Sequence, residues 1–214
     1  SLLKFNLPSG HIWLDEQRML LMHARALGAL RKELFETLGL KRARGLLVRL
    51  GFASGIRDGQ LAQKHRRPGS SIEEAFMLGP QLHTLEGMVQ VEKLSIEINL
   101  PTKHFYGEFV WKNSWEDEAH VADYGQGDEP ACWTMIGYAS GYTSAFMGKL
   151  VLFREMECMS QGDSQCLIIG QSAEAWNDPD YEDYFKAQAF AEELIEYHMA
   201  AEKLDSALIR RRSN

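Results

Sequence analysis

The sequence has few of the residues and patterns that mark several specialised classes of protein. It contains three cysteines, too few for a closed disulfide framework, and six prolines among 214 residues, so collagen-like and proline-rich disordered chains are excluded. No apolar run approaches the roughly 18 residues that span a bilayer, and the N-terminus lacks a basic stretch followed by an apolar core. We therefore expect a cytoplasmic protein with no membrane segment.

Positive charge is also scarce. Twenty-three Lys and Arg residues stand against 30 Asp and Glu, a formal net charge of −7, whereas nucleic-acid binders usually carry a basic excess. We therefore expect no nucleic-acid binding through this segment. The 45% of hydrophobic residues is typical of a folded chain, and the length fits one large domain or two small ones.

Hydrophobic periodicity predicts a mixed α+β fold. Apolar residues at helical spacing, with small residues in the last case, predict helices over residues 21–38, 40–65, 71–78 and 132–148. Ser71 and Glu74 form a capping-box signature, and Gly79-Pro80 is expected to interrupt the helix that they start. Alternating or short apolar runs predict strands over residues 10–14, 88–98, 105–111, 150–157 and 166–169. The last two should form an antiparallel hairpin.

One predicted strand carries an aromatic face. Phe105, Gly107, Phe109 and Trp111 alternate with other residues and so point to one side of the sheet. Such a face is either a pocket wall or a core wall, and a buried tryptophan is more often core than a ligand contact.

A histidine on a short predicted helix is a second candidate ligand contact. Glu86 follows His83 by three residues and could accept a proton from the imidazole. A satisfied structural histidine is the commoner case.

The three cysteines form the main candidate metal site. Cys158 and Cys166 bracket the loop of the predicted hairpin, so both thiols can reach one point, and Cys132 lies within 35 residues of Cys166. Three thiolates plus one further group would complete a tetrahedral zinc site. Three buried apolar thiols are the alternative interpretation. From sequence alone the fourth ligand is open among Glu155, Glu157, Asp163 and His120.

Enzyme signatures are mostly absent from the sequence. There is no GxSxG, HExxH or GxGxxG motif. The segment from Gly141 to Lys149 superficially resembles a phosphate-binding loop, but six residues separate its glycines and Leu150 replaces the Ser or Thr that binds magnesium. We therefore do not interpret it as a nucleotide site.

The C-terminal segment has the spacing of a coiled coil. Its apolar residues are separated by alternating steps of four and three, although the run is short. They are Phe190, Leu194, Tyr197, Ala201, Leu204 and Leu208. This spacing predicts a linker helix that either contributes to a homodimer or docks on its own domain.

Three sequence segments carry a family resemblance. Residues 12–19 (IWLDEQRM), 79–83 (GPQLH) and 132–142 (CWTMIGYASGY) resemble the sensory domain of aromatic-responsive, sigma-54-dependent transcriptional activators of the XylR, DmpR, MopR and PoxR type, within the NtrC family. The resemblance extends from about residue 10 to about residue 205.

The resemblance implies a domain division and a metal site. It implies an N-terminal part of the aromatic-sensing domain at 1–116, a four-vinyl-reductase-like zinc-binding part at 117–177, and a linker helix at 178–214 toward an ATPase domain that is absent here. The implied cofactor is zinc. Its implied ligands are Cys132, Glu155, Cys158 and Cys166.

The resemblance also implies a function. The domain would bind phenol or a related small aromatic in a buried pocket and relieve repression of the adjoining ATPase, as a homodimer without enzyme activity. His83 and Trp111 would hold the effector's hydroxyl. The expected aromatic lining is Phe76, Phe109, Tyr138, Tyr142 and Phe153. Two alternatives stay open: an enzyme for hydrophobic substrates related to vinyl reductases, and a structural zinc module that binds another protein.

Overall fold

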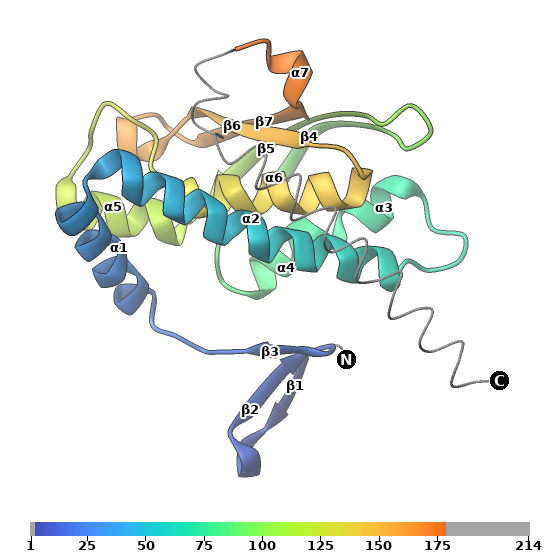
Figure 1. Ribbon diagram of the computed structural model, residues 1–214, viewed down its shortest axis with the longest axis horizontal. Helices are drawn as coiled ribbons and strands as arrows, with labels where there is room; N and C mark the ends of the chain where they lie inside the picture. The colour runs from blue at the N-terminus through green and yellow to red at the C-terminus, as the bar shows by residue number, and fades with distance from the viewer. Residues whose placement is uncertain (1–2, 179–214) are drawn as a thin grey trace.

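The computed structural model describes residues 3–178 of the chain (Figure 1). The predicted linker helix at 178–214, with its heptad-like positions, lies outside the described residues apart from residue 178. The α-helices are α1 Ala24–Leu38, α2 Leu40–Lys64, α3 Ile72–Phe76, α4 Leu78–Leu85, α5 Trp115–Tyr124, α6 Trp133–Met147 and α7 Ala173–Trp176. The strands are β1 Leu3–Asn6, β2 His11–Leu14, β3 Gln17–Met19, β4 Gln90–Asn99, β5 His104–Lys112, β6 Val151–Glu157 and β7 Cys166–Ser172. The expected α+β class is confirmed.

The main sheet interleaves strands from distant parts of the sequence. Its order is β4-β5-β7-β6, and every neighbouring pair is antiparallel. The predicted hairpin is present as β6 and β7, and the β4–β5 register shifts between Lys93 and Ser95. Because β5 pairs with β7, Trp111 lies opposite Cys166. The aromatic strand and the cysteine hairpin therefore share one sheet.

Two helices beside this sheet approach each other at backbone distance. In Figure 1, α6 lies next to the sheet and α2 runs along α6. Glycines line the contact on both helices: Gly51, Gly55 and Gly59 on α2, and Gly137 and Gly141 on α6. A Cβ atom at Gly55 would lie 2.1 Å from the carbonyl oxygen of Tyr138. We call this contact the glycine seam, and it fixes the position of α6 relative to α2.

The N-terminal strands form a separate small sheet, β1-β2-β3, which projects from the body (Figure 1). Leu14 of β2 is buried against Leu61 of α2 and Leu82 of α4. Next to it, the Oδ2 atom of Asp15 lies 2.8 Å from Nζ of Lys64. One small apolar cluster and the ion pairs of Lys64 with Asp15 and Glu16 thus attach this sheet to the helices.

Two local expectations were wrong. The break after α3 falls at Met77, and Gly79 and Pro80 lie inside α4, because proline and glycine are tolerated in the first turn of a helix, where the N–H groups need no intrahelical partner. The sequence patterns predict no helix between residues 111 and 132, yet this stretch contains α5, whose cap is Ser114, with its hydroxyl accepting from the N–H of Asp117. Three acidic residues in its first turn also suit the helix dipole.

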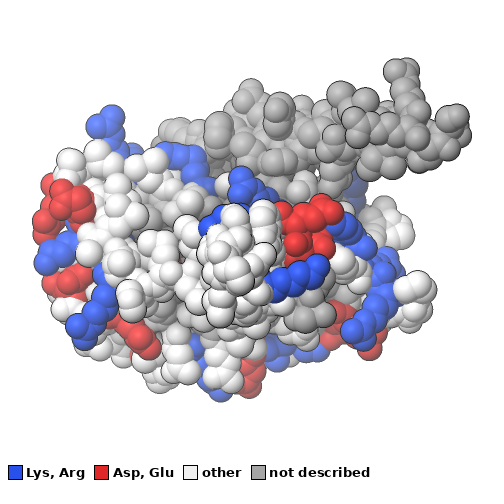
Figure 2. All heavy atoms as spheres, turned by 90° about the horizontal axis from the view of Figure 1, so that it is seen from below, with Lys and Arg blue, Asp and Glu red and all other residues white. Residues whose placement is uncertain are grey.

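The described part of the chain has helices of limited apolar length and a face of mixed charge. No helix there is long and apolar enough to cross a membrane. On the face shown in Figure 2, Lys and Arg side chains are mixed with Asp, Glu and uncharged residues. That face therefore offers no continuous basic stripe of the kind that follows a phosphate backbone.

Candidate functional site

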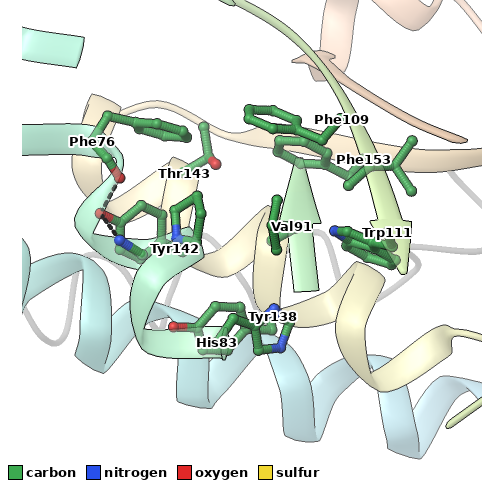
Figure 3. A pocket seen from close by; sticks show the side chains of 13 residues that line it. Phe76, His83, Val91, Phe109, Trp111, Tyr138, Tyr142, Thr143 and Phe153 are labelled. Carbon is green, nitrogen blue, oxygen red and sulfur yellow. Dashed lines mark hydrogen bonds between the residues drawn. The ribbon is translucent and has the colours of Figure 1, made fainter. Parts of the chain in front are cut away.

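A pocket lies between α6, the α3–α4 segment and the main sheet (Figure 3). The space among its lining atoms, which includes the solvent at its mouth, is about 340 Å³. All seven residues that the resemblance assigned to the effector site line it together: Phe76, His83, Phe109, Trp111, Tyr138, Tyr142 and Phe153. Gly79, Pro80, Val91, Ala139, Thr143 and Ile168 complete the lining. Sequence analysis did not single out these six as pocket residues.

His83 and Trp111 form a polar pair on the pocket wall. Their ring centroids are 6.3 Å apart and the rings are nearly perpendicular, at 80°. Neither ring nitrogen of His83 nor the indole N–H of Trp111 has a hydrogen bond to another described residue. Burial lowers the pKa of His83 to about 3, so its imidazole is neutral near pH 7. The pair therefore combines a donor, the indole N–H, with a ring that offers one donor and one acceptor.

The expected contact between His83 and Glu86 is not formed, since no hydrogen bond joins these two described residues. Tyr138 orients His83 instead: the two rings stack at 4.0 Å with an interplanar angle of 15°. The Tyr138 hydroxyl donates to Oδ2 of buried Asp58 at 2.7 Å. Burial and the nearby Asp58 carboxylate raise the pKa of Glu86 to about 8. Because the Tyr138 hydroxyl is hydrogen-bonded to Asp58, it is not the group that would pair with a ligand in the pocket.

Tyr142 fastens the α3–α4 segment to α6. Its hydroxyl donates to the carbonyl oxygen of Phe76 at 2.7 Å and accepts from the N–H of Gly79 at 2.9 Å. A Cβ atom at position 79 would lie 2.3 Å from the Tyr142 ring, so only glycine permits this approach. Both sides of the break between α3 and α4 are held by one hydroxyl group.

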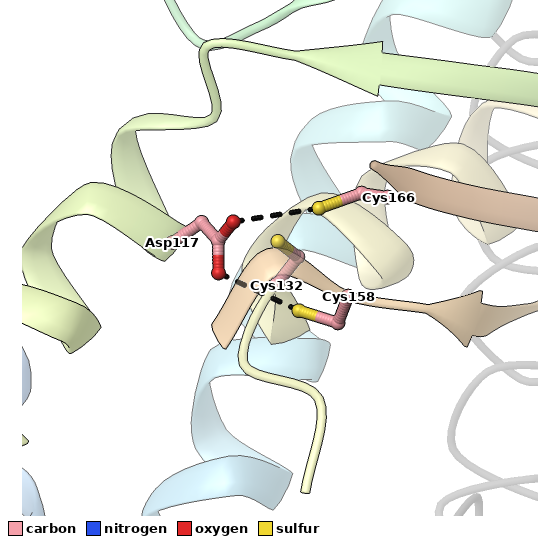
Figure 4. A group of neighbouring side chains, drawn as sticks. All are labelled: Asp117, Cys132, Cys158 and Cys166. Atoms are coloured by element: carbon pink, nitrogen blue, oxygen red, sulfur yellow. Dashed lines mark hydrogen bonds between the residues drawn. The ribbon is translucent and has the colours of Figure 1, made fainter. Parts of the chain in front are cut away.

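The three cysteines meet at the end of the sheet next to the pocket (Figure 4). Their sulfur atoms and a carboxylate oxygen of Asp117 all lie within 4.8 Å of one another, and all four residues are buried. The thiols of Cys158 and Cys166 donate to the two oxygens of Asp117 at 3.5 and 3.4 Å. Sequence analysis missed Asp117, because only the β5–β7 pairing brings the start of α5 beside Cys166.

Glu155, the fourth ligand implied by the resemblance, also reaches this cluster. Its Oε2 atom accepts from the backbone N–H of Cys132 at 3.2 Å, and its Oε1 atom is buried without a hydrogen-bond partner among the described residues. Two carboxylates therefore compete for the fourth position. The other three candidates do not join the three sulfurs in the described group of possible ligands. Glu157 accepts from the side chain of Gln165, Asp163 accepts from the N–H of Cys158, and His120 contacts Arg31.

The cluster's charges favour a cation. Burial and the neighbouring Cys158 raise the pKa of Asp117 to about 6, and the same two causes raise the pKa of Glu155. Negative charge is thus costly for both carboxylates, and a divalent cation would relieve that cost.

A buried ion pair holds the two sides of the cluster in place. The carboxylate of Glu116 accepts from the N–H of Thr134 at 2.8 Å, at the start of α6, and its Oε1 atom lies 3.5 Å from Nε of Arg31. Asp117 directly follows Glu116, and Cys132 precedes Thr134 by two residues. The contact between Glu116 and Thr134 therefore brings Asp117 and Cys132 together.

Comparison with known proteins decides the family. One family model, described as an activator of aromatic catabolism, matches residues 1–99, and the model of the four-vinyl reductase domain matches residues 111–171. The crystal structure of the phenol-responsive sensory domain of the transcription activator PoxR, solved with phenol, is 49% identical; the alignment covers 85% of this chain and 90% of that one, with a TM-score of 0.82. The chain is a sensory domain of the XylR-type activators.

Two curated relatives extend the comparison for this XylR-type sensory domain. The phenol regulator MopR of Acinetobacter guillouiae is 45% identical over 176 residues, which cover 82% of this chain and 31% of MopR. The transcriptional regulatory protein XylR of Pseudomonas putida is 42% identical over 209 residues, which cover 97% of this chain and 37% of XylR. The chain thus spans about a third of each relative. The chain has a ligand-sensing regulatory role, and both relatives are regulators.

Proposed function

We propose that this domain senses phenol or a closely related small aromatic in the pocket, with the hydroxyl held by His83 and Trp111. The observation that carries this proposal is the unpaired donor and acceptor capacity of these two side chains on the wall of a buried aromatic pocket. Phenol has about seven heavy atoms, so micromolar binding needs most of the roughly 1.5 kcal/mol per atom that small ligands reach. Such a high binding energy per atom requires an aromatic cavity whose polar groups become paired with the ligand when it binds.

Trp111→Phe tests the role of the indole. This substitution keeps an aromatic ring and removes the N–H donor, so the affinity for phenol should fall about 5- to 150-fold, as expected for about 1–3 kcal/mol from an unpaired buried polar group. Toluene has no hydroxyl, and its affinity should change little. Isothermal titration calorimetry of both ligands measures the difference.

Trp13→Phe is the matched control for this titration, because Trp13 lies on β2, outside the pocket. An equal loss for phenol and toluene in Trp111→Phe would mean that Trp111 acts by shape alone. Unchanged affinity for phenol would place the site elsewhere.

In a longer chain, we propose that effector binding relieves repression of an adjoining ATPase domain. The family supports this role, because the two curated relatives are regulators more than twice as long as this chain. An effector can act in this way only if it binds one arrangement of sensor and linker more tightly than the other.

We further propose that the cysteine cluster holds one structural zinc ion through Cys132, Cys158, Cys166 and Glu155. The clustered sulfurs and the unpaired Oε1 atom of Glu155 support this ligand set, with Asp117 as the competing fourth ligand. When bound, zinc would crosslink the start of α6 to the β6–β7 hairpin and would contribute to folding rather than to chemistry.

We propose that the parts at residues 1–116, 117–177 and 178–214 correspond to separate sequence families and do not fold as separate units. The two family models support it, since one ends at residue 99 and the other begins at residue 111. The first two parts share the main sheet through the β5–β7 pairing. Each of them alone would therefore leave an open sheet edge.

We also propose a homodimer, on the family resemblance and on the heptad-like spacing of Leu194, Leu204 and Leu208. Removing residues 189–214 should weaken the dimer or change its geometry. Sedimentation velocity at tens of micromolar, roughly the range in which a modest interface dissociates, measures this. A monomeric full chain at that concentration would contradict the proposal.

A further inference from the structure

The pocket has more polar groups than one hydroxyl requires. Five of its side chains carry a polar atom: His83, Trp111, Tyr138, Tyr142 and Thr143. The two tyrosine hydroxyls are engaged with Asp58 and with the α3–α4 backbone. If the proposed function assigns His83 and Trp111 to the effector's hydroxyl, the hydroxyl of Thr143 remains.

Thr143 is buried and unpaired, although its helix satisfies neighbouring hydroxyls. Its exposure is 1%, and it has no hydrogen bond to a described residue, including the carbonyl of Ala139 one turn earlier. In contrast, Ser140 donates to the Ile136 carbonyl and accepts from the N–H of Phe153. Ser144 likewise donates to the carbonyl and accepts from the N–H of Val151.

The position of Thr143 separates it from the first polar pair. In Figure 3 Thr143 lies on the side of the pocket where Phe76, Phe109 and Phe153 lie, and His83 and Tyr138 lie on the opposite side. Thr143 follows Tyr138, the residue stacked on His83, by five positions, which is roughly 7.5 Å along a helix axis. A ring bound at His83 and Trp111 would therefore meet Thr143 with its far side.

We propose that Thr143 forms a second polar subsite, which pairs with a second hydroxyl group on the aromatic ring and so extends the effector class from phenol to dihydric phenols. The inference rests on the proposed function. The separation along α6 favours a second hydroxyl in the meta or para position, because an ortho hydroxyl would stay beside His83 and Trp111. A threonine hydroxyl both donates and accepts, so it can pair with a phenolic hydroxyl in either direction.

Calorimetric titration with four probes tests this subsite: phenol, catechol, resorcinol and hydroquinone. The variant Thr143→Val has nearly the same shape and lacks the hydroxyl. In that variant, the affinity for resorcinol or hydroquinone relative to phenol should fall about 5- to 100-fold, because the second hydroxyl is left unpaired. The ratio of catechol to phenol should stay within about twofold. Thr143→Ser retains the hydroxyl and should restore most of the lost ratio.

Thr37→Val, on the exposed part of α1, is the matched control and should leave all four affinities unchanged. Equal changes for phenol and the meta or para diols in Thr143→Val would overturn the subsite, since Thr143 would then act by shape. An unchanged ratio would overturn it as well. Wild-type protein that binds none of the four probes would instead contradict the proposed function, and the subsite with it.

Discussion

Replacement of Gly55 by alanine is expected to remove about 4 kcal/mol or more of folding stability, a large part of the roughly 5–15 kcal/mol of a typical domain. The added Cβ atom would lie 2.1 Å from the carbonyl oxygen of Tyr138 and 2.7 Å from the backbone nitrogen of Tyr142. Both are backbone atoms of α6, so no side-chain rotation relieves the clash. The two helices must separate, and they carry the pocket tyrosines with them.

Gly45→Ala provides the matched control on the same helix. A Cβ atom there meets only the end of the flexible Arg49 side chain, at 3.3 Å. Because alanine is the better helix former, this variant should be neutral or gain about 0.5–1 kcal/mol. Urea denaturation of the two variants and the wild type measures the contrast. A loss of less than about 1 kcal/mol in Gly55→Ala, within the range of ordinary surface substitutions, would show that the glycine seam is not a close contact.

Loss of the metal is the second change with a large expected effect. If zinc joins the start of α6 to the β6–β7 hairpin, Cys158→Ser should give insoluble or poorly folded protein, because zinc-binding free energy in such sites is folding free energy, on the order of 10 kcal/mol. Ser164→Ala in the same hairpin loop is the control and should fold normally. Because the cysteine variant leaves little soluble material, a chelator titration of wild-type protein followed by thermal unfolding supplies the second measurement.

Elemental analysis gives the direct test of the metal site. We expect one zinc per chain, and wild-type protein that is metal-free and yet unfolds cooperatively at a normal temperature would refute the site. Glu155→Gln and Asp117→Asn distinguish the competing carboxylates. Glu155→Gln should lose more zinc affinity, and a larger loss in Asp117→Asn would assign the fourth position to Asp117 instead.

Local patterns predicted much of this fold. The alternation that places Phe105, Phe109 and Trp111 on one face is a property of any strand, and β5 has these residues buried. The capping box at Ser71 is present for the same reason, since it depends on neighbours three residues apart. The family resemblance brought together seven residues of one pocket from four distant segments.

What the sequence could not provide depends on long-range packing. Asp117 reaches the cysteines through a strand order that places β7 between β5 and β6. The glycine seam requires two helices about 85 residues apart to meet in one register, and Gly55 on its own is only a poor helix former. Thr143 stands out only once its neighbours' partners are known, because an unpaired hydroxyl has no signature in the chain.

The two hydrogen bonds that the Tyr142 hydroxyl makes to the α3–α4 segment indicate which wall of the pocket can move. The α2–α6 pair approaches at backbone distance along the glycine seam, so it forms a fixed frame, and the opposite wall is a hydrogen-bonded sheet. The α3–α4 segment carries Phe76 and His83 and is joined to that frame by the two hydrogen bonds of one phenol oxygen. We therefore expect a small ring to enter and leave the cavity past this segment, which would have to break both hydrogen bonds of Tyr142 and shift the buried side chains of Phe76 and Leu82.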